Sequence, residues 1–488
     1  MKYLLGIDFG GGASKATLLS EEGNIVAEHS VEYPTLHPSA GFCEQNPDDW
    51  YKALCEDTTE LIKKADISAD DILAIAIDSA THTAVLCDEN YKPLRPAIHW
   101  TDTRSKKQAD DLRVHTEMIS KKTFAEPGTI WTLPQIIWVR ENEPDVFSKL
   151  SKIFFEKDYL RYQLTGVYCT DYIEAQGSML FDNNTMAWDE ELCRLAGISS
   201  SIMPPIVKPT DIIGNVTEEA SRATGLTVGT PVICGTTDTV MEVFASGAVD
   251  KGQMTVKLAT AGRICVITDK SVPHPYLINY AHIVDGLWYP GTATKAAASS
   301  YRWYRDTFGG DYKELDQGAA ECDLGANGLL FHPYINGELT PYADPMLCGS
   351  FIGIRAEHTK AHFTRAVLEG VSLSLLDNMM ALNELNVPHD NFATLIGGGA
   401  KAKLWRQITA DMLGITLKIT ESSDSSFGSA MLAGIAVGVF KDAKEAVKKC
   451  VKVMDTVIPN PENTAKYAEI FKIYKKVHDA LAPIYRER

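Results

Sequence analysis

The spacing of apolar and polar positions predicts a mixed α/β chain. Short apolar runs that end at glycine-containing turns are typical of strands, and such runs predict strands over residues 3–7, 15–20, 24–33 and 72–77. Between the last two runs, apolar positions recur at helical spacing, which predicts a helix over residues 48–65. The resulting β-β-β-α-β order differs from the β-α-β start of a dinucleotide-binding domain.

The second half of the chain repeats part of this pattern. Strands are predicted over residues 254–259 and 264–268, around a turn of small residues, and over residues 393–396 before a glycine turn. A long amphipathic stretch predicts a helix over residues 361–385. Two hairpins that each open half of the chain indicate an internal duplication, with a boundary near residues 249–252. The strand order matches one lobe of an actin-like ATPase, so the two hairpin tips are expected on opposite sides of one phosphate group.

Length, charge and cysteine content narrow the classes of function. The chain has 488 residues, too many for a single hydrophobic core, so at least two domains are expected. A net charge of -17 argues against nucleic acid and anionic membranes as partners, since both attract basic surfaces. No run approaches the roughly 20 apolar residues of a membrane span, and the ten cysteines include no C-x-x-C pair. We therefore expect a reduced, cytoplasmic protein.

The first motif that can carry chemistry is a glycine-rich turn within residues 5–15, LGIDFGGGASK. Gly10, Gly11 and Gly12 lack a Cβ and let backbone N–H groups approach phosphate oxygens. Asp8, at the end of the preceding strand, is placed to hold Mg²⁺ through water, and Lys15 adds a positive charge nearby. The segment lacks the G-K-S/T ending of a Walker loop, and a plain tight turn is the alternative interpretation.

Two further motifs follow predicted strands. In Cys234–Thr239, small hydroxyl residues lead to Asp238 at the start of a predicted helix, where a carboxylate can accept a proton from a substrate hydroxyl. A helix N-cap is the alternative role for this aspartate. In Leu395–Lys401, three glycines join a strand to a helix, an arrangement that fits the ribose or phosphates of a nucleotide. The alternative there is a turn required only for packing.

Together these segments resemble the FGGY family of carbohydrate kinases along nearly the whole chain. The family's second signature is matched at each constrained position by Gly349–Ile354 and, seven residues further on, by His362–Phe363 and Ala366–Glu369. The family patterns E-Q-x-P-x-x-W, K-D-Y-L with L-T-G, and P-Y-x-x-G-E-x-T-P are matched within residues 44–50, 157–166 and 333–341.

The chain also departs from the family at several positions. Gln135 stands where the family commonly has Lys, and Leu339 where Arg is usual. Gly11 and Gly12 replace the hydroxyl residues expected after Asp-x-Gly, which leaves Ser14 and backbone amides to bind phosphate.

The resemblance implies an α/β fold of two actin-like (ribonuclease H-like) domains with a central cleft. Residues 1–249 would carry most sugar-binding residues, and residues 250–488 most of the nucleotide site. ATP with Mg²⁺ would bind in the cleft, with Asp238 as the proton acceptor and Asp8 as the first-motif aspartate. The implied nucleotide-binding residues are Gly10, Gly11, Gly12, Ser14, Lys15, Thr260, Gly262, Gly398, Gly399, Ala400 and Lys403. Trp303 is a further nucleotide candidate, with core packing as its alternative.

The resemblance also implies a substrate site. Xylulose kinases usually read Gly-x-Met-His-Gly where this chain has Asp78–Thr83, so the histidine is kept and a threonine replaces the methionine. A set of His, Asp, Arg and Trp side chains suits a ligand dense in hydroxyls. The implied substrate-binding residues are Thr81, His82, Trp100, Asp102, Arg104 and Thr239. A surface ion pair is the alternative for Asp102 and Arg104.

The predicted activity is ATP-dependent phosphorylation of a sugar hydroxyl. In the expected mechanism the lobes close, Mg²⁺ and the hairpin tips neutralise the phosphates, and Asp238 deprotonates the hydroxyl. A ketopentose such as D-xylulose is the first choice, while a hexulose, an aldonate such as gluconate and a four-carbon polyol stay open. The rival is a sugar-responsive regulator without turnover, which the altered hairpin favours. Sugar and ATP are the expected partners, without nucleic acid or membrane, and a homodimer stays open.

Overall fold

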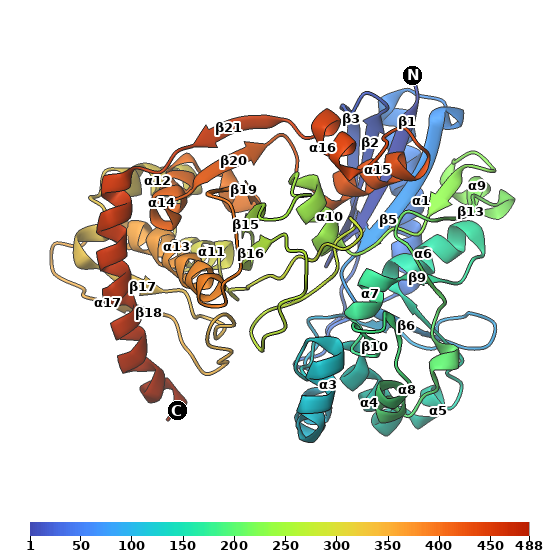
Figure 1. Cartoon of the computed structure of the whole chain (residues 1–488), viewed down its shortest axis with the longest axis horizontal. Coiled ribbons are helices and arrows are strands. Elements are labelled where there is room, and N and C mark those ends of the chain that lie inside the picture. Colours follow the sequence, from blue (N-terminus) through green and yellow to red (C-terminus); the bar gives the residue numbers. More distant parts are fainter. Residues whose placement is uncertain (488) are drawn as a thin grey trace. The chain divides into compact units, whose positions relative to one another are not determined.

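The structure is a computed structural model that describes residues 1–487. The chain divides into two compact units, whose elements are labelled in Figure 1. The first unit contains Met1–Val249 together with Tyr280–Asp285 and Ser422–Val451. The second contains Asp250–Asn279, Gly286–Glu421 and the described residues from Lys452 onward. The first unit therefore includes two segments from beyond residue 250.

A six-stranded mixed sheet forms the centre of the first unit. Its order is β13-β14-β5-β1-β2-β3, with bounds Ile212–Asn215, Pro231–Ile233, Ile72–Ser79, Tyr3–Phe9, Ala13–Ser20 and Ile25–Glu32. β1 pairs antiparallel with β2 and parallel with β5, and β14 pairs parallel with β5. The strands β1, β2 and β3 are antiparallel because short turns can join only antiparallel neighbours.

One face of this sheet packs on α1 (Pro47–Ala65), beside α6 (Glu156–Thr165). The helix α1 begins after Asn46, whose side chain accepts a hydrogen bond from the Asp48 N–H at 3.2 Å. Apolar side chains at alternate strand positions form a buried core with the helix: Leu5, Ile7, Phe9, Ala16, Leu18, Trp50 and Leu54. This alternation is the period of a strand, and it leaves the other set of side chains for the opposite face.

The opposite face packs on α15 (Ser425–Ala436), drawn in red in Figure 1 although it lies against the blue N-terminal strands. The contact is close because Gly6 has no side chain; a Cβ there would overlap the carbonyl oxygen of Ser426. Thr17 Oγ1 lies 2.8 Å from Ser426 Oγ on the same face. Asp8 and Lys15, paired across β1 and β2, therefore face the N-terminal end of α15.

A second, four-stranded sheet lies in the first unit. Its order is β4-β7-β6-β8, with bounds Glu44–Gln45, Ala97–Ile98, Ala84–Cys87 and Lys152–Phe155. The other strands are β9 (Thr170–Asp171), β10 (Phe181–Asp182), β11 (Ala187–Trp188) and β12 (Ile206–Val207). The other helices are α2 (Lys106–Asp111), α3 (Thr116–Thr123), α4 (Thr132–Asn142), α5 (Pro144–Phe147), α7 (Tyr172–Gln176), α8 (Glu190–Ala196), α9 (Glu218–Thr224), α10 (Asp238–Ala245) and α16 (Ala443–Cys450).

The second unit is built on a five-stranded sheet of order β16-β15-β19-β20-β21. The bounds are Gly262–Val266, Met254–Leu258, Phe392–Ile396, Thr416–Thr420 and Val453–Val457. A hairpin (β15, β16), two strands parallel to β15 and an antiparallel edge strand follow one another, which is also the arrangement of β2-β1-β5-β14-β13. The shared arrangement agrees with the internal duplication predicted from the sequence.

The described residues of the second unit also form five α-helices. They are α11 (Ala298–Phe308), α12 (Tyr312–Ala320), α13 (Lys360–Glu384), α14 (Lys403–Leu413) and α17 (Pro461–Arg486). Of these, α13 contacts β16, and α14 contacts β20 and β21. A small sheet of β17 (Leu330–His332) and β18 (Ser350–Ile352) lies against α13. Gly370 of α13 makes this contact close, because a Cβ there would overlap the carbonyl oxygen of Phe331.

The second family signature, which is the most specific of the sequence matches, has a structural role. Glu369, the last residue of the second signature, is buried and accepts hydrogen bonds from Arg365 Nε at 2.6 Å and Tyr467 Oη at 2.8 Å. It also accepts one from the Gly325 N–H at 3.0 Å. The signature therefore ties α13 to α17 and to the segment before β17.

The predicted elements are confirmed to within a few residues. The strands predicted at 3–7, 72–77 and 393–396 correspond to β1, β5 and β19. The helices predicted over 48–65 and 361–385 correspond to α1 and α13. Over residues 1–487, no helix combines the length and the apolar character that crossing a membrane requires.

Candidate active site

Two carboxylates lie opposite each other at the carboxyl ends of neighbouring strands in the first unit. Asp8 of β1 is in register with Asp78 of β5. Ser429 of α15 donates a hydrogen bond to Asp78. Burial raises the pKa of Asp8 to about 7, with the negative charge of Asp238 as a further cause, and burial also raises the pKa of Asp78. This pair holds fewer than two negative charges near neutral pH.

A third carboxylate begins the helix that follows the third strand end. Asp238 is the first residue of α10, and the N-cap is Thr237. Asp238 Oδ1 accepts hydrogen bonds from Thr81 Oγ1 at 3.1 Å and from the Thr239 N–H at 2.7 Å. The turn into the helix needs Gly235, whose φ is 69° and where a Cβ would overlap the Ile77 carbonyl oxygen.

A buried charge network supports this turn. Thr236 Oγ1 donates to Asp171 at 2.8 Å, and Lys157 Nζ lies 2.9 Å from the same carboxylate. Lys157 also lies 2.5 Å from Asp158, which in turn is 2.9 Å from Arg161. Arg161 donates to the backbone carbonyl of Cys234 at 2.7 Å. The K-D-Y-L motif therefore fixes the backbone from which Asp238 projects.

Two buried glutamates near these aspartates were not predicted from the sequence. Glu156 lies directly before the K-D-Y-L motif, and neither of its carboxylate oxygens has a hydrogen-bond partner among the described residues. Burial and the charge of Asp8 raise its pKa well above the usual value. Glu174 accepts a hydrogen bond from the His82 N–H at 2.6 Å, and burial raises its pKa as well. Neither glutamate lies beside a glycine turn at a strand end, the signal that marked Asp8 and Asp238.

The aspartate pair fits a divalent cation held through water. Asp8 Oδ1 and Asp78 Oδ1 are buried and lack hydrogen-bond partners within residues 1–487. Mg²⁺ prefers carboxylate oxygens and keeps several waters, needing only one or two protein ligands. No group of three ligating side chains was found in the described part of the chain. The donor set therefore suits a hydrated Mg²⁺ that arrives with phosphate oxygens.

His82 is held in an unusual backbone conformation. Its φ is 56°, in the left-handed region that few residues other than glycine adopt. Gly177 makes room for it, since a Cβ there would lie 2.7 Å from His82 Cδ2. Thr132 Oγ1 donates to the His82 carbonyl at 2.9 Å. Burial, with the nearby charge of His99, lowers the pKa of His82 to about 3, so its imidazole is neutral at physiological pH.

A second histidine, His99, was missed by the sequence analysis. It is 3% exposed, and a Cβ on Gly11 would lie 3.8 Å from its Nε2 atom. Its Nδ1 atom is 2.8 Å from Thr101 Oγ1, while Nε2 has no hydrogen-bond partner among the described residues. Burial lowers its pKa to about 4. The sequence feature that could have pointed to His99 is its place in an apolar run directly before Trp100.

The segment after Trp100 does not present free charges. Asp102 accepts bidentate hydrogen bonds from Arg104, with Nη2 at 2.8 Å and Nε at 3.0 Å. Arg104 Nη1 also donates to Glu44 at 2.7 Å, and its guanidinium lies 3.8 Å from the centre of the Phe42 ring. The side chains of Asp102 and Arg104 are almost fully buried, so the pair is internal rather than a surface ion pair. Trp100 is 41% exposed.

The glycine turn between β1 and β2 is braced by neighbouring side chains. The Gly10 N–H donates to the Ala13 carbonyl at 3.0 Å, and the Gly11 carbonyl accepts from Gln45 Nε2 at 3.1 Å. Ser14 is not brought to this turn, because its buried hydroxyl donates to Asp57 on the α1 face. Lys15 lies on the Asp8 face, where it pairs with Asp424 and, at 2.9 Å, with Glu28. Gly12 is the remaining glycine of the turn.

In the second unit, a pocket of about 810 Å³ lies beside the predicted nucleotide segments. Its lining includes Thr260, Gly398, Gly399 and Lys403, four of the predicted residues. It also includes Tyr301, Tyr312, Asp316 and Gln317 of α11 and α12, which the sequence analysis did not select. Tyr301 Oη donates to Asp316 at 2.7 Å. The pocket has the size of a nucleotide-binding site.

The three other nucleotide candidates of the second unit do not line this pocket. Trp303 is 37% exposed, and its ring stacks on Phe331 with 6.3 Å between the ring centres. Gly262 packs inward, since a Cβ there would lie 2.6 Å from Thr294 Cγ2. Ala400 is buried, and its carbonyl accepts a hydrogen bond from Arg406.

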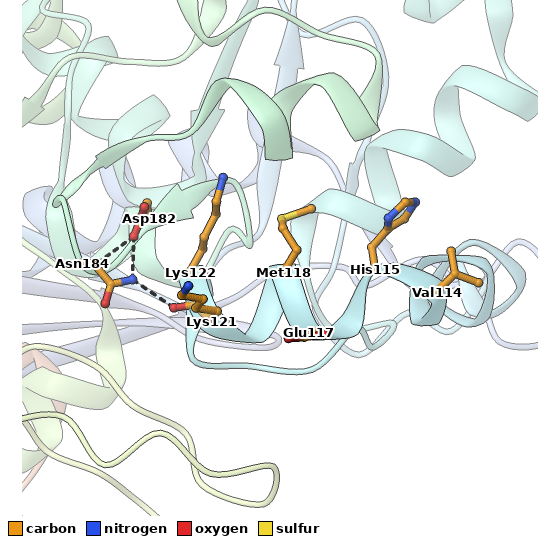
Figure 2. Close-up of a pocket in the computed structure, with 8 residues that line it drawn as sticks. All are labelled: Val114, His115, Glu117, Met118, Lys121, Lys122, Asp182 and Asn184. Carbon is orange, nitrogen blue, oxygen red and sulfur yellow. Dashed lines mark hydrogen bonds between the residues drawn. The ribbon is translucent and has the colours of Figure 1, made fainter.

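A separate hollow of about 640 Å³ lies on α3 and the segments beside it in the first unit. Figure 2 shows Met118, Lys121 and Lys122 along α3, with Asp182 and Asn184 joined by a hydrogen bond. Lys122 is already paired with Asp189 and Glu191, each at 2.8 Å. None of the predicted site residues lines this hollow.

The fold and these groups define a class of protein: a two-domain actin-like enzyme with a carboxylate cluster in one unit and a nucleotide-sized pocket in the other. The chain belongs to the FGGY family of carbohydrate kinases. Residues 3–245 match the family's N-terminal domain, and residues 255–437 match its C-terminal domain. It is therefore a phosphotransferase.

Similar proteins include kinases for two kinds of substrate. The chain is 33% identical to the xylulose kinase of Bacillus subtilis, over 98% of this chain and 97% of the relative. It is 30% identical to the gluconokinase of the same organism, over 97% of this chain and 94% of the relative. The structure of a ligand-bound xylulose kinase from Lactobacillus acidophilus aligns with a TM-score of 0.93 and 26% identity, covering 100% of both chains.

Proposed function

We propose that the chain transfers the γ-phosphoryl group of ATP to a hydroxyl of a small uncharged sugar, with D-xylulose as the first candidate. The observation that carries the proposal is the position of Asp238. It begins a helix at a strand end, beside the Asp8–Asp78 pair, on a backbone fixed by buried charges. A carboxylate in this position can accept the proton of a substrate hydroxyl as the phosphoryl group arrives.

The charge distribution supports an uncharged sugar over an aldonate. Buried cations of the first unit already pair with carboxylates: Arg95, Arg104, Lys157 and Arg161. The buried imidazoles His82 and His99 are neutral at physiological pH. An aldonate carboxylate placed among Asp8, Asp78 and Asp238 would meet like charges, which costs free energy in a buried site. Sugar hydroxyls can accept from and donate to neutral imidazoles at no such cost.

ATP and Mg²⁺ are part of this proposal. The pocket beside Gly398 and Lys403 offers aromatic and polar side chains for a nucleoside. Bound Mg²⁺ would neutralise phosphate charge, and Asp8 and Asp78 are the residues proposed to hold it through water. The predicted cytoplasmic location and homodimer stay predictions, and sedimentation tests the second.

A coupled assay of ADP release tests the proposal directly. The panel comprises D-xylulose, a hexulose, gluconate and a four-carbon polyol, each with ATP and Mg²⁺. We expect the highest kcat/KM for D-xylulose and the lowest for gluconate. A gluconate preference would contradict the charge argument and favour the activity named for the gluconokinase relative. If none of these compounds gives ADP release but calorimetry shows that sugars bind, the result would instead support a sugar-responsive regulator.

A further inference from the structure

Thr81 holds the carboxylate that we propose as the catalytic base. Its Oγ1 atom donates to Asp238 Oδ1 at 3.1 Å, across a separation of 157 residues. Both residues belong to the first unit, so the contact lies within one compact body. A hydrogen bond to a carboxylate is stronger than one between neutral groups and fixes the direction of its acceptor.

The backbone that carries Thr81 is held from several sides. The next residue, His82, donates its N–H to Glu174 and accepts from Thr132 at its carbonyl. A Cβ on Gly177 would lie 2.9 Å from Thr81 Cγ2, so the methyl group points toward that glycine. In threonine a single χ1 angle places both the methyl group and the hydroxyl, so a methyl group held in one position also fixes the direction of the hydroxyl. The hydroxyl therefore stays directed at the aspartate.

We infer that Thr81 is a positioning residue for the phosphoryl transfer, acting by orienting the Asp238 carboxylate toward the substrate hydroxyl. The inference rests on the proposed function of Asp238. It assigns the Thr81 hydroxyl to the base rather than to the sugar, which changes the substrate-binding role predicted from the sequence. The Thr239 N–H shares the same oxygen at 2.7 Å, so two donors fix one oxygen of the carboxylate.

Two variants that differ by a single oxygen test the role of the hydroxyl. Thr81→Ser keeps the donor and Thr81→Ala removes it, and both are smaller than threonine, so neither overfills the site. We expect Thr81→Ala to lower kcat about 10- to 100-fold, because a catalytic group that loses its orientation loses rate on this scale. Thr81→Ser should stay within about threefold of the wild type. KM for D-xylulose and for ATP should change little in both variants.

A double-mutant cycle separates positioning from a structural effect. In an Asp238→Asn background, Thr81→Ala should change the residual turnover far less than it does in the wild-type background. Equal losses in both backgrounds would overturn the inference, as would wild-type kcat in Thr81→Ala or an equal loss in Thr81→Ser. A rise in sugar KM alone would return Thr81 to substrate binding. Retained turnover in Asp238→Asn would instead refute the proposed base, and the positioning role would fail with it.

Discussion

Asp8 and Asp78 lie opposite each other on parallel strands, and burial raises the pKa of both. In the folded chain, ionising one of these carboxylates beside the other costs free energy, because their negative charges repel each other. Hydroxyl groups of α15 offset part of this cost, since Ser429 donates to Asp78 and a hydrogen bond from Ser425 lowers the pKa of Asp8. A bound cation would offset the rest. The cluster is therefore a place where binding a charged ligand and folding stability are linked.

The first prediction follows from the pKa of Asp8, which is about 7 in the fold. A raised carboxyl pKa contributes stability that is complete below the unfolded value, near 4, and is lost as pH rises through about 7. The wild-type chain without Mg²⁺ should lose about 1 kcal/mol through this group between pH 6 and pH 8. Asp8→Asn stays neutral, so its melting temperature should fall less over this range. A larger fall in the variant would contradict the assignment.

The second prediction concerns the proposed base. Asp238→Asn keeps the shape of the side chain and removes its ability to take a proton, so kcat should fall by about 10²- to 10⁴-fold. Thermal unfolding and sugar binding should change little. Asp285→Asn is a matched control, because Asp285 is an exposed aspartate whose carboxylate lies 3.0 Å from the exposed Lys208 side chain. A variant that keeps more than about a tenth of wild-type kcat would remove Asp238 from the mechanism.

The third prediction separates two adjacent glycines of the pocket that we propose for the nucleotide. No atom lies within 4 Å of a Cβ built on Gly398, so a side chain there enters open space beside the pocket. On Gly399 a Cβ would lie 2.8 Å from Leu258 Cβ and 3.1 Å from the Trp405 ring. Gly398→Val should raise KM for ATP at least tenfold, with little change in stability. Gly399→Ala should lower the melting temperature through overpacking.

Steady-state kinetics with varied ATP and varied sugar measure the first effect, and a thermal melt measures the second. If both glycine variants lose stability without a selective rise in ATP KM, the turn serves packing alone. If Gly398→Val raises both KM values equally, the pocket is not the nucleotide site.

The sequence predicted the elements and the strand-end aspartates because their signals are local. A glycine turn after an apolar run marks the position of Asp8 and Asp238 whatever surrounds it. Contacts between segments that are far apart in the sequence have no such local signal. The Thr81–Asp238 hydrogen bond spans 157 residues, and Ser14 turned toward Asp57 because the side-chain alternation of β2 placed it on the α1 face. His99 becomes a candidate site residue only because the fold places it against Gly11.

The last prediction concerns His82 as a ligand for the sugar. Its Nδ1 atom is buried and has no hydrogen-bond partner in the described part of the chain. A substrate hydroxyl in that position would satisfy it, and losing such a bond costs about 1–3 kcal/mol, or roughly one to two decades in kcat/KM.

Alanine alone is an ambiguous test of this role, because φ of His82 is 56° and alanine is strained in the left-handed region. Asparagine adopts that region readily, so His82→Asn is the variant that preserves the backbone, with His82→Ala beside it. Both should lower kcat/KM for D-xylulose by one to two decades while slow sugar-independent ATP hydrolysis stays unchanged. Because the pKa of His82 is about 3, its imidazole stays neutral from pH 5 to 8, and the wild-type advantage over His82→Asn should be constant across that range. Wild-type kinetics in His82→Asn, with a loss only in His82→Ala, would show that the residue serves the backbone conformation and not the sugar.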